Sequence, residues 1–334
     1  KTTDVDWDAV VKVSTSHYVF PALYCNLKRA DFLQYLPHEL VSYMEYITDI
    51  NRERNKQIIL QANELNNVLL ANNIRPIFLK GTGNLLAGIY DDIAERMVGD
   101  IDFIFSKEDY PKAIKLLRNF DYSEVIKYDY HYPEGKHYRR LQKENNIAAI
   151  EIHKELLLEK YTNEFNYSFV EKDSQVINGI AILSYANKLN LSIIANQIND
   201  HGFYYKTMAL RNAYDVFLLS KKTKAKAAVN TLDKLTNPLN CFLAACYDVF
   251  NSADSLEYNN TKKVASYLSI FNSQFTNTIK TERKHKRIKS SLFIKSRLNL
   301  IYKCLIYREF RVWLLNLLTD KEFYKRRLVE FKKK

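Results

Sequence analysis

Residues 99–105 read Gly-Asp-Ile-Asp-Phe-Ile-Phe, and this segment constrains the fold more than any other part of the chain. Apolar side chains occupy every second position, and two aspartates separated by one residue take alternate positions between them. A period of two predicts a β-strand, because successive side chains of a strand point to opposite faces. Asp100 and Asp102 are therefore expected on one face of a sheet, opposite Ile101, Phe103 and Phe105.

Helical and extended patterns flank this strand. Apolar residues at helical spacing predict an amphipathic helix over residues 51–73. Residues 77–79 predict a short buried strand that ends at a Lys80-Gly81 turn, and residues 84–90 predict a helix. We also expect a helix that begins at Asp109, followed by three strands over residues 123–128, 136–142 and 147–153.

These elements predict an α/β fold of the α+β kind, with a small mixed β-sheet, flanking helices and a helical C-terminal domain. Beyond Leu156 the periodicity is predominantly helical. We expect three parts: residues 1–50 form a helical segment that packs on the core, residues 51–160 form the core, and residues 161–334 form a helical, basic C-terminal domain.

Composition narrows the class of protein. The chain has 334 residues, of which 47% are hydrophobic and 26% charged, so we expect a folded globular protein. Aspartates occupy the opening residues, where a secretory signal would be basic and then apolar. Apolar stretches are shorter than the roughly 18 to 20 residues that span a bilayer, and the four cysteines form no CxxC pair. A cytoplasmic protein without a membrane span is expected.

Positive charge is concentrated in the last third of the chain. Residues 221–334 hold 25 of the 50 Lys and Arg residues but only 9 of the 38 Asp and Glu residues. This asymmetry suits a polyanionic partner, and the dense basic cluster of residues 280–297 suits RNA. Basic helices whose charges simply face solvent explain the same pattern equally well.

Three acidic residues are the candidate metal ligands. Asp100 and Asp102 project from the same face of a strand, so together they can hold a hard divalent cation such as Mg²⁺. Glu151 lies between two isoleucines on the later predicted strand and can complete the acidic cluster if the two strands are neighbours. Solvent-exposed carboxylates at a strand end, or a glutamate paired with a lysine, are the structural alternatives.

The turn after the first strand is a candidate phosphate site. Lys80, Gly81 and Thr82 stand where a strand meets a helix, and small residues there let backbone amides approach phosphate oxygens. Arg96, four residues before Asp100, can contact a triphosphate, or it can form a surface salt bridge to Glu95 or Asp92. A site built on His131, His137 and His153 fits no known ligand spacing, so hydrogen-bonded or exposed histidines are expected instead.

The combination LKGTGNLLAGIYDDIAERMVGDIDFIF and, later, IEIH resembles the nucleotidyltransferase superfamily to which DNA polymerase beta belongs. More narrowly, it resembles a branch of largely uncharacterised bacterial nucleotidyltransferases. The branch has a Leu-Lys-Gly turn, an Arg before a Gly-Asp-hydrophobic-Asp strand, and a later acidic strand that ends in His. The matching positions are Leu79, Lys80, Gly81, Arg96, Gly99, Asp100, Asp102, Glu151 and His153.

The resemblance implies Mg²⁺-dependent transfer of a nucleoside monophosphate from an NTP such as ATP to an acceptor hydroxyl, with release of pyrophosphate. Asp100, Asp102 and Glu151 would be the catalytic residues and would hold the metal, two Mg²⁺ ions when the NTP is bound. Glu151 would also activate the acceptor hydroxyl. The nucleotide would contact Lys80, Gly81, Thr82 and Arg96.

The acceptor stays open among a small hydroxylated molecule, RNA and a protein. A non-catalytic module that binds nucleotide or RNA on the same scaffold is the alternative, although all three acidic positions are present. Docking of the basic C-terminal region on anionic lipid is a third hypothesis, and no lipidation motif supports it.

Overall fold

The structure is a computed structural model that describes residues 5–125, 132–133, 135–157, 159–321 and 324–325. The chain divides into two compact units. The first comprises residues 1–125 and 136–273, and the second comprises residues 126–135 and 274–334. All of the predicted site residues lie in the first unit. The predicted division into residues 1–50, 51–160 and 161–334 stays a prediction.

Among the described residues, the strands are β1 Ile77–Phe78, β2 Asp100–Ile104, β3 Ser123–Glu124, β4 Leu141–Gln142, β5 Ala149–His153, β6 Gln175–Ile177 and β7 Ile180–Ile182. They form one mixed sheet in the order β3-β4-β5-β2-β1-β7-β6. β2 pairs in parallel with β5 and antiparallel with β1, and β1 pairs in parallel with β7. The other neighbours are antiparallel. The strand with two aspartates is therefore interior to the sheet.

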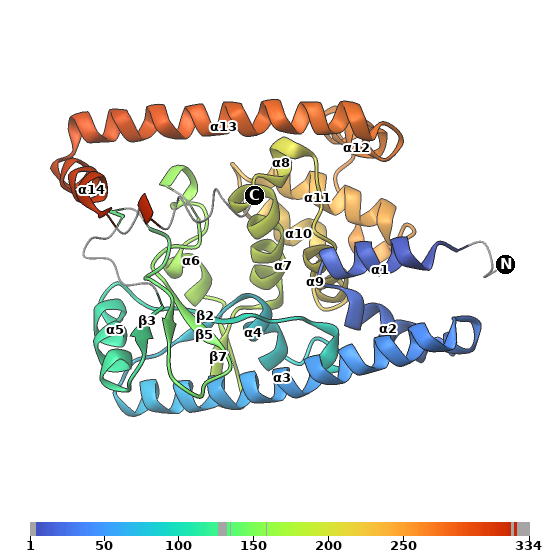
Figure 1. The fold of residues 1–334 in the computed structure, drawn as a ribbon, viewed down its shortest axis with the longest axis horizontal. Coiled ribbons are helices and arrows are strands. Elements are labelled where there is room, and N and C mark those ends of the chain that lie inside the picture. The colour runs from blue at the N-terminus through green and yellow to red at the C-terminus, as the bar shows by residue number, and fades with distance from the viewer. Residues whose placement is uncertain (1–4, 126–131, 134, 158, 322–323, 326–334) are drawn as a thin grey trace. The chain divides into compact units, whose positions relative to one another are not determined.

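Helices make up most of the rest of the first unit. Those before the last sheet hairpin are α1 Trp7–Ser16, α2 Phe20–Arg29, α3 His38–Ala71, α4 Lys80–Leu86, α5 Asp109–Asn119 and α6 Tyr167–Glu171. Those after it are α7 Tyr185–Ile194, α8 Gly202–Tyr205, α9 Leu210–Ser220, α10 Ala225–Asn230, α11 Thr236–Val249 and α12 Lys262–Thr276. A π-helical turn, Ala195–Asn199, directly follows α7. Figure 1 shows the mixed sheet and the helices around it, which confirms the predicted fold class.

The long helix α3 supports the sheet from below in the view of Figure 1. Its predicted apolar face is confirmed, because Ile58, Ala62, Leu65 and Leu69 are each at most 4% exposed. These side chains belong to the same hydrophobic core as the apolar residues of β1 and β2. The helix begins earlier than predicted, at His38, because its first turns pack on α2 in a smaller second core.

The hairpin β6–β7 was not predicted, since the sequence beyond Leu156 was interpreted as predominantly helical. Asn178 and Gly179 both have positive φ, 51° and 79°. An Asn-Gly turn of this kind matches the twist of antiparallel strands and joins tight hairpins. The predicted strand over residues 123–128 is represented by β3, and its last residues lie outside the described part of the chain.

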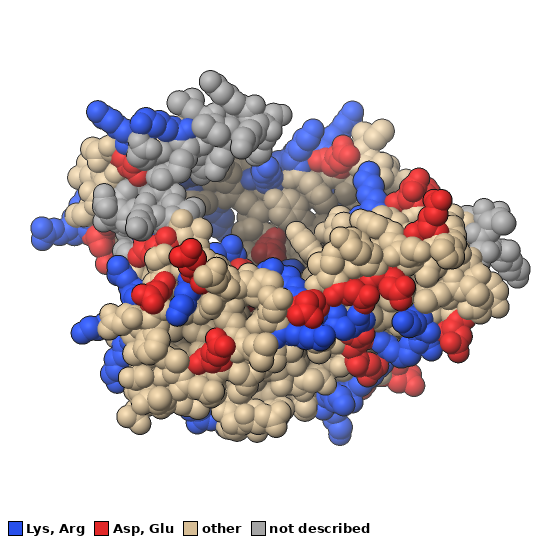
Figure 2. Space-filling model, turned by 60° about the horizontal axis from the view of Figure 1, so that its bottom comes forward, with Lys and Arg blue, Asp and Glu red and all other residues tan. Residues whose placement is uncertain are grey.

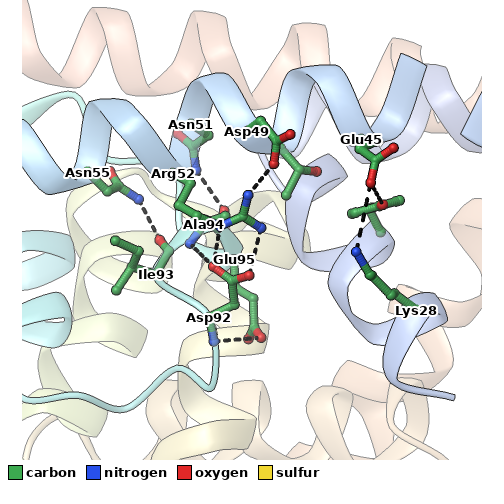
Figure 3. A network of polar contacts seen from close by, with 12 residues as sticks. Lys28, Glu45, Asp49, Asn51, Arg52, Asn55, Asp92, Ile93, Ala94 and Glu95 are labelled. Atoms are coloured by element: carbon green, nitrogen blue, oxygen red, sulfur yellow. Dashed lines mark hydrogen bonds and ion pairs between the residues drawn. The ribbon is translucent and has the colours of Figure 1, made fainter. Parts of the chain in front are cut away.

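Polar side chains of α3 hold the segment that leads into β2 (Figure 3). The side-chain amide of Asn51 donates to the carbonyl of Ala94 at 2.7 Å, and that of Asn55 donates to the carbonyl of Ile93 at 2.6 Å. These carbonyls belong to the 3-10 turn Ile93–Glu95, which lies between α4 and β2. The segment that leads into the acidic strand is thus bound to α3.

Among the described residues, the face shown in Figure 2 carries no patch of a single charge sign, because acidic and basic side chains are interspersed. Several form ion pairs on α3, such as Lys56 with Glu53 at 3.3 Å. Exposed pairs of this kind contribute about 0 to 1 kcal/mol each. Pairs of this kind on α3 therefore add little to the stability of the fold.

The second unit contains α13 Thr278–Ile306 and α14 Arg308–Thr319. The predicted basic cluster lies on α13, and these side chains are exposed: Lys280, Arg283, Lys284, Lys286, Arg287, Lys289, Lys295 and Arg297. Contact with RNA through residues 280–297 stays a prediction. Within the described residues, every helix is too short or too polar to traverse a lipid bilayer.

Candidate active site

Two neighbouring parallel strands bring the predicted acids together. Asp102 on β2 is the register partner of Glu151 on β5, and Asp100 is opposite Ala149. Side chains at paired positions of adjacent strands project to the same face, so the three carboxylates lie on one face of the sheet. The alternate residues face the core and are fully buried: Ile101, Phe103, Ile150 and Ile152.

Basic side chains contact all three carboxylates. The Nζ of Lys80 lies 2.6 Å from Asp102 Oδ1 and 3.7 Å from Glu151 Oε2. Arg140 pairs with the carboxylate of Asp100 through Nη2, which also lies 3.4 Å from Glu151 Oε1. Lys80 was predicted at this site. Arg140 was not, because its place in a predicted strand did not reveal which strand it would face.

The backbone at Lys80 is strained. Its φ of 49° is in the left-handed region, which is unfavourable for a residue with a Cβ and costs about 1–3 kcal/mol. Strain of this kind persists only where surrounding structure enforces it. The conformation starts α4 directly after β1 and places the Lys80 ammonium against the carboxylates.

Hydrogen bonds and close packing hold the first turn of α4. Thr82 is fully buried and its hydroxyl donates to the carbonyl of Asp100 at 2.9 Å. A Cβ at Gly83 would lie 2.7 Å from the carbonyl oxygen of Phe78, and one at Gly81 would lie 2.9 Å from Val98. Both glycines therefore permit close packing within the protein. The predicted phosphate contacts of Gly81 and Thr82 stay predictions.

His153 ends β5 and is buried beside the acids. Its Nε2 lies 2.9 Å from Asp102 Oδ1 and 3.9 Å from Glu151 Oε2. Burial lowers the pKa of His153 below its ordinary value, so the imidazole is neutral near pH 7. A neutral imidazole that donates to a carboxylate orients that carboxylate, as in many metal sites. The sequence analysis expected a hydrogen-bonded or exposed histidine and did not place it in the acidic cluster.

The charged groups of the site set one another's protonation. Burial by itself would raise the pKa of Asp102, but Lys80 and His153 hold it well below its usual range. Burial also lowers the pKa of Lys80, and the attraction of Asp102 and Glu151 reverses this and raises it. Burial raises the pKa of Asp100, although Arg140 opposes the shift. Asp102 and Lys80 are therefore a firmly ionised pair, and Asp100 is the carboxyl that is protonated more easily.

The donor set fits a divalent cation. One ligand atom each from Asp102, Glu151 and His153 lie within 4.8 Å of one another, which is close enough for a single ion. Carboxylate oxygens suit Mg²⁺ and Mn²⁺, and an imidazole nitrogen also suits transition metals. Asp100 lies on the same strand face but is not part of this group of three, and its carboxylate pairs with Arg140.

Arg96 does not form the surface salt bridge that was considered for it. The guanidinium is buried, and its Nε lies 3.1 Å from both carboxylate oxygens of Asp215 on α9. Asp92 and Glu95 pair with Arg52 and Arg29 instead. The predicted contact of Arg96 with a triphosphate stays a prediction.

Further charged residues near the cluster were not identified from the sequence. Burial lowers the pKa of Lys136, and the nearby charge of Lys80 adds to this, while Asp200 and Glu151 oppose it. Arg211 also lies close to Asp200, and its Nε is buried without a hydrogen-bond partner. These residues come from a loop, from the end of the π-helical turn and from α9, so no local pattern in the sequence connects them.

Fold and site together define a nucleotidyltransferase-like class: a mixed sheet with acids on two parallel strands and basic groups around them. The chain belongs to a family of uncharacterised nucleotidyltransferases, whose match covers residues 3–252.

Two solved structures are similar to this chain. One is an antigenic nucleotidyltransferase-like protein from Paracoccidioides brasiliensis, 14% identical with a TM-score of 0.38 over 62% of this chain and 93% of that chain. The other is JHP933 from Helicobacter pylori, 16% identical with a TM-score of 0.32 over 72% of this chain and 97% of that chain. The comparison with curated proteins finds no match.

Proposed function

We propose that this chain is an active nucleotidyltransferase, which moves a nucleoside monophosphate from an NTP to an acceptor hydroxyl and releases pyrophosphate. The observation that carries the proposal is the register pairing of Asp102 with Glu151, with Asp100 on the same face and Lys80 between the carboxylates. Membership of a nucleotidyltransferase family supports it.

Asp100, Asp102 and Glu151 are the residues that would hold Mg²⁺, two ions when the NTP is present, and His153 would orient Asp102. Bound Mg²⁺ supplies neutralisation of the negative charge on the triphosphate and on the departing pyrophosphate. Lys80 and Arg140 lie next to the same carboxylates and would bind phosphate oxygens. The protein's part in the reaction is thus to position the substrates and to stabilise charge.

Glu151 is proposed to accept the proton of the acceptor hydroxyl. Its side chain remains 16% exposed, so a hydroxyl group can reach it. The acceptor oxygen forms a bond to the α-phosphorus while the bond from the α-phosphorus to the bridging oxygen breaks. Pyrophosphate leaves with that electron pair, and Glu151 holds the proton.

The acceptor is proposed to be a small hydroxylated molecule, RNA or a protein. Exposed basic residues along α13 favour RNA among these. The non-catalytic alternative, a module that binds nucleotide or RNA, predicts binding of NTP without its turnover.

The test is to incubate the full chain with Mg²⁺ and each of the four α-labelled NTPs, in the presence of total RNA, cell metabolites or protein extract. We expect pyrophosphate release and transfer of label to one of these acceptor pools, and loss of both in Asp102→Ala. Release that persists in Asp102→Ala would disprove this site. NTP binding without release in any pool would establish the non-catalytic alternative.

A further inference from the structure

The carboxylates of the candidate active site are already neutralised in large part by the protein. Asp102 contacts Lys80, Asp100 contacts Arg140, and Glu151 lies near both basic groups. Three negative charges thus face two positive charges, with the imidazole beside them neutral. A divalent cation that enters this cluster must compete with side chains that are bound there.

Lys80 is the principal competitor. Its ammonium lies 2.6 Å from Asp102 Oδ1 and 3.7 Å from Glu151 Oε2, so it sits between the two carboxylates that could share a cation. A cation held by the same oxygens needs the place of the ammonium, and the two positive charges would also repel each other.

The side chain of Lys80 is able to leave this place. It remains 35% exposed, and its flexible four-carbon stem carries donors that can turn toward another anion. On departure the ammonium needs a new negative partner, because desolvating an unpaired charge is unfavourable. The phosphates of an incoming substrate would supply that partner beside the same carboxylates.

We infer that Lys80 is an exchangeable counter-cation: it occupies the acidic cluster until a divalent cation and a polyphosphate bind together, and it then pairs with the polyphosphate. The inference rests on the proposed function. It follows that free metal binds weakly and that metal and polyphosphate promote each other's binding, because each removes the obstacle that the other faces.

The experiment compares Mn²⁺ with the preformed complex of Mn²⁺ and inorganic tripolyphosphate, which carries no base and so avoids any base preference. Binding of each probe to the full chain is measured by calorimetry, with free Mn²⁺ checked by electron paramagnetic resonance. Lys80→Met keeps the length of the side chain and removes its charge. Lys112→Met is the matched control, since Lys112 pairs only with Asp109 on the exposed face of α5 among the contacts described.

We expect Lys80→Met to bind free Mn²⁺ about tenfold more tightly than the wild type and to bind the Mn²⁺–tripolyphosphate complex about tenfold more weakly. Lys112→Met should match the wild type for both probes. Opposite effects of Lys80→Met on the two probes are specific to exchange, because structural damage would weaken the binding of both probes. Lys80→Arg keeps the charge and should bind free Mn²⁺ as weakly as the wild type. This control shows whether tighter binding by Lys80→Met comes from loss of the charge or from replacement of the lysine.

Free Mn²⁺ binding by Lys80→Met that is no tighter than that of the wild type would overturn the inference. Asp102→Asn separates this failure from that of the proposed function. If Asp102→Asn abolishes Mn²⁺ binding, the metal site stands even where Lys80 has no effect. If Mn²⁺ binding survives in Asp102→Asn, or no variant binds either probe, both the site and the inference fail.

Discussion

The Nε of Arg96 lies 3.1 Å from both carboxylate oxygens of Asp215, and this ion pair joins the approach to β2 with α9. Tyr90 donates a further hydrogen bond to Asp215 Oδ1 at 2.7 Å. Only 7% of Arg96 and 2% of Asp215 are exposed. The pair therefore ties the strand that carries the acids to a helix much later in the chain.

Removing one partner of this pair should destabilise the fold. Asp215→Asn leaves the buried guanidinium of Arg96 without its counter-charge, and we expect a loss of about 3–5 kcal/mol in the free energy of unfolding. Urea denaturation measures it. Asp49→Asn, which removes an exposed partner of Arg52, is the control and should cost less than about 1 kcal/mol. Equal stabilities of the two variants would show that the buried pair is not structural.

A substitution at Gly83 would test how tightly the turn that positions Lys80 is packed. A Cβ there would meet the backbone oxygen of Phe78 at 2.7 Å, whereas a Cβ on Gly99 would have nothing within 4 Å. We expect Gly83→Ala to lose about 1–3 kcal/mol of stability through overpacking, and Gly99→Ala to change it little. Thermal unfolding of both variants checks this, and a neutral Gly83→Ala would mean that α4 shifts freely.

The buried side chain of Lys188 should make the free energy of unfolding depend on pH. The Nζ of this buried residue donates to the carbonyl of Gly83 at 2.7 Å, and burial lowers the pKa of Lys188 from 10.5 to about 7, opposed by Asp215. The unfolded chain therefore binds more protons between about pH 7 and pH 10.5. Over that range the stability of the wild type should rise with pH relative to Lys188→Met, by up to about 1.4 kcal/mol per pH unit.

Below pH 7 the lysine is charged in both states, so the difference between wild type and Lys188→Met should become constant. Urea unfolding at pH 6, 8 and 9.5 gives this difference directly, and groups common to both proteins cancel. A difference that does not change with pH would show that the Lys188 ammonium is charged in the folded chain throughout.

Glu151 is expected to affect turnover more than folding. Glu151→Gln removes the proposed proton acceptor and should lower the rate of pyrophosphate release by about 100-fold or more. Glu53→Gln, at an exposed position of α3, is the control and should retain the wild-type rate. A rate for Glu151→Gln within a factor of about three of the wild type would exclude this residue as the base.

RNA binding through α13 should make the binding constant depend on salt concentration in a way that can be measured. If Arg283, Lys284 and Arg287 contact phosphates, their replacement by alanine should reduce the slope of log K against log salt by about 2 for single-stranded RNA. Replacing Lys56, Lys112 and Lys115 should leave the slope unchanged. Filter binding over a range of KCl concentrations measures it, and equal slopes for both triple variants would exclude α13 as the RNA surface.

The sequence predicted the strands of the site because their signals are local. Alternation in residues 99–105 marks β2, and the isoleucines around Glu151 mark β5. Both strands were expected in one sheet, but the sequence did not decide whether they are neighbours; the structure shows that they pair in parallel. The hairpin β6–β7 also had a local signal, Asn178-Gly179, but its short strands were hidden among helical patterns.

Lys80 was predicted from the turn after β1, but Arg140 and the buried partner of Arg96 could not be predicted from a local pattern. Arg140 reaches Asp100 across 40 residues of chain, and Arg96 reaches Asp215 across 119. The sequence around one partner does not identify the other, since ion pairs between distant segments follow no regular spacing along the chain. The sequence indicated the acids because one strand carries two of them, whereas the pairing of Arg140 with Asp100 is shown only by the folded chain.

The pairing of β2 with β5 sets the spacing of Asp102 and Glu151 through main-chain hydrogen bonds, although a long stretch of chain separates the two strands. A cut or an insertion between α5, β3 and β4 would preserve this register, whereas slipping β5 by one residue would turn Glu151 into the hydrophobic interior. Ladder register, rather than chain continuity, is therefore what an engineer would have to preserve when splitting or circularly permuting this protein.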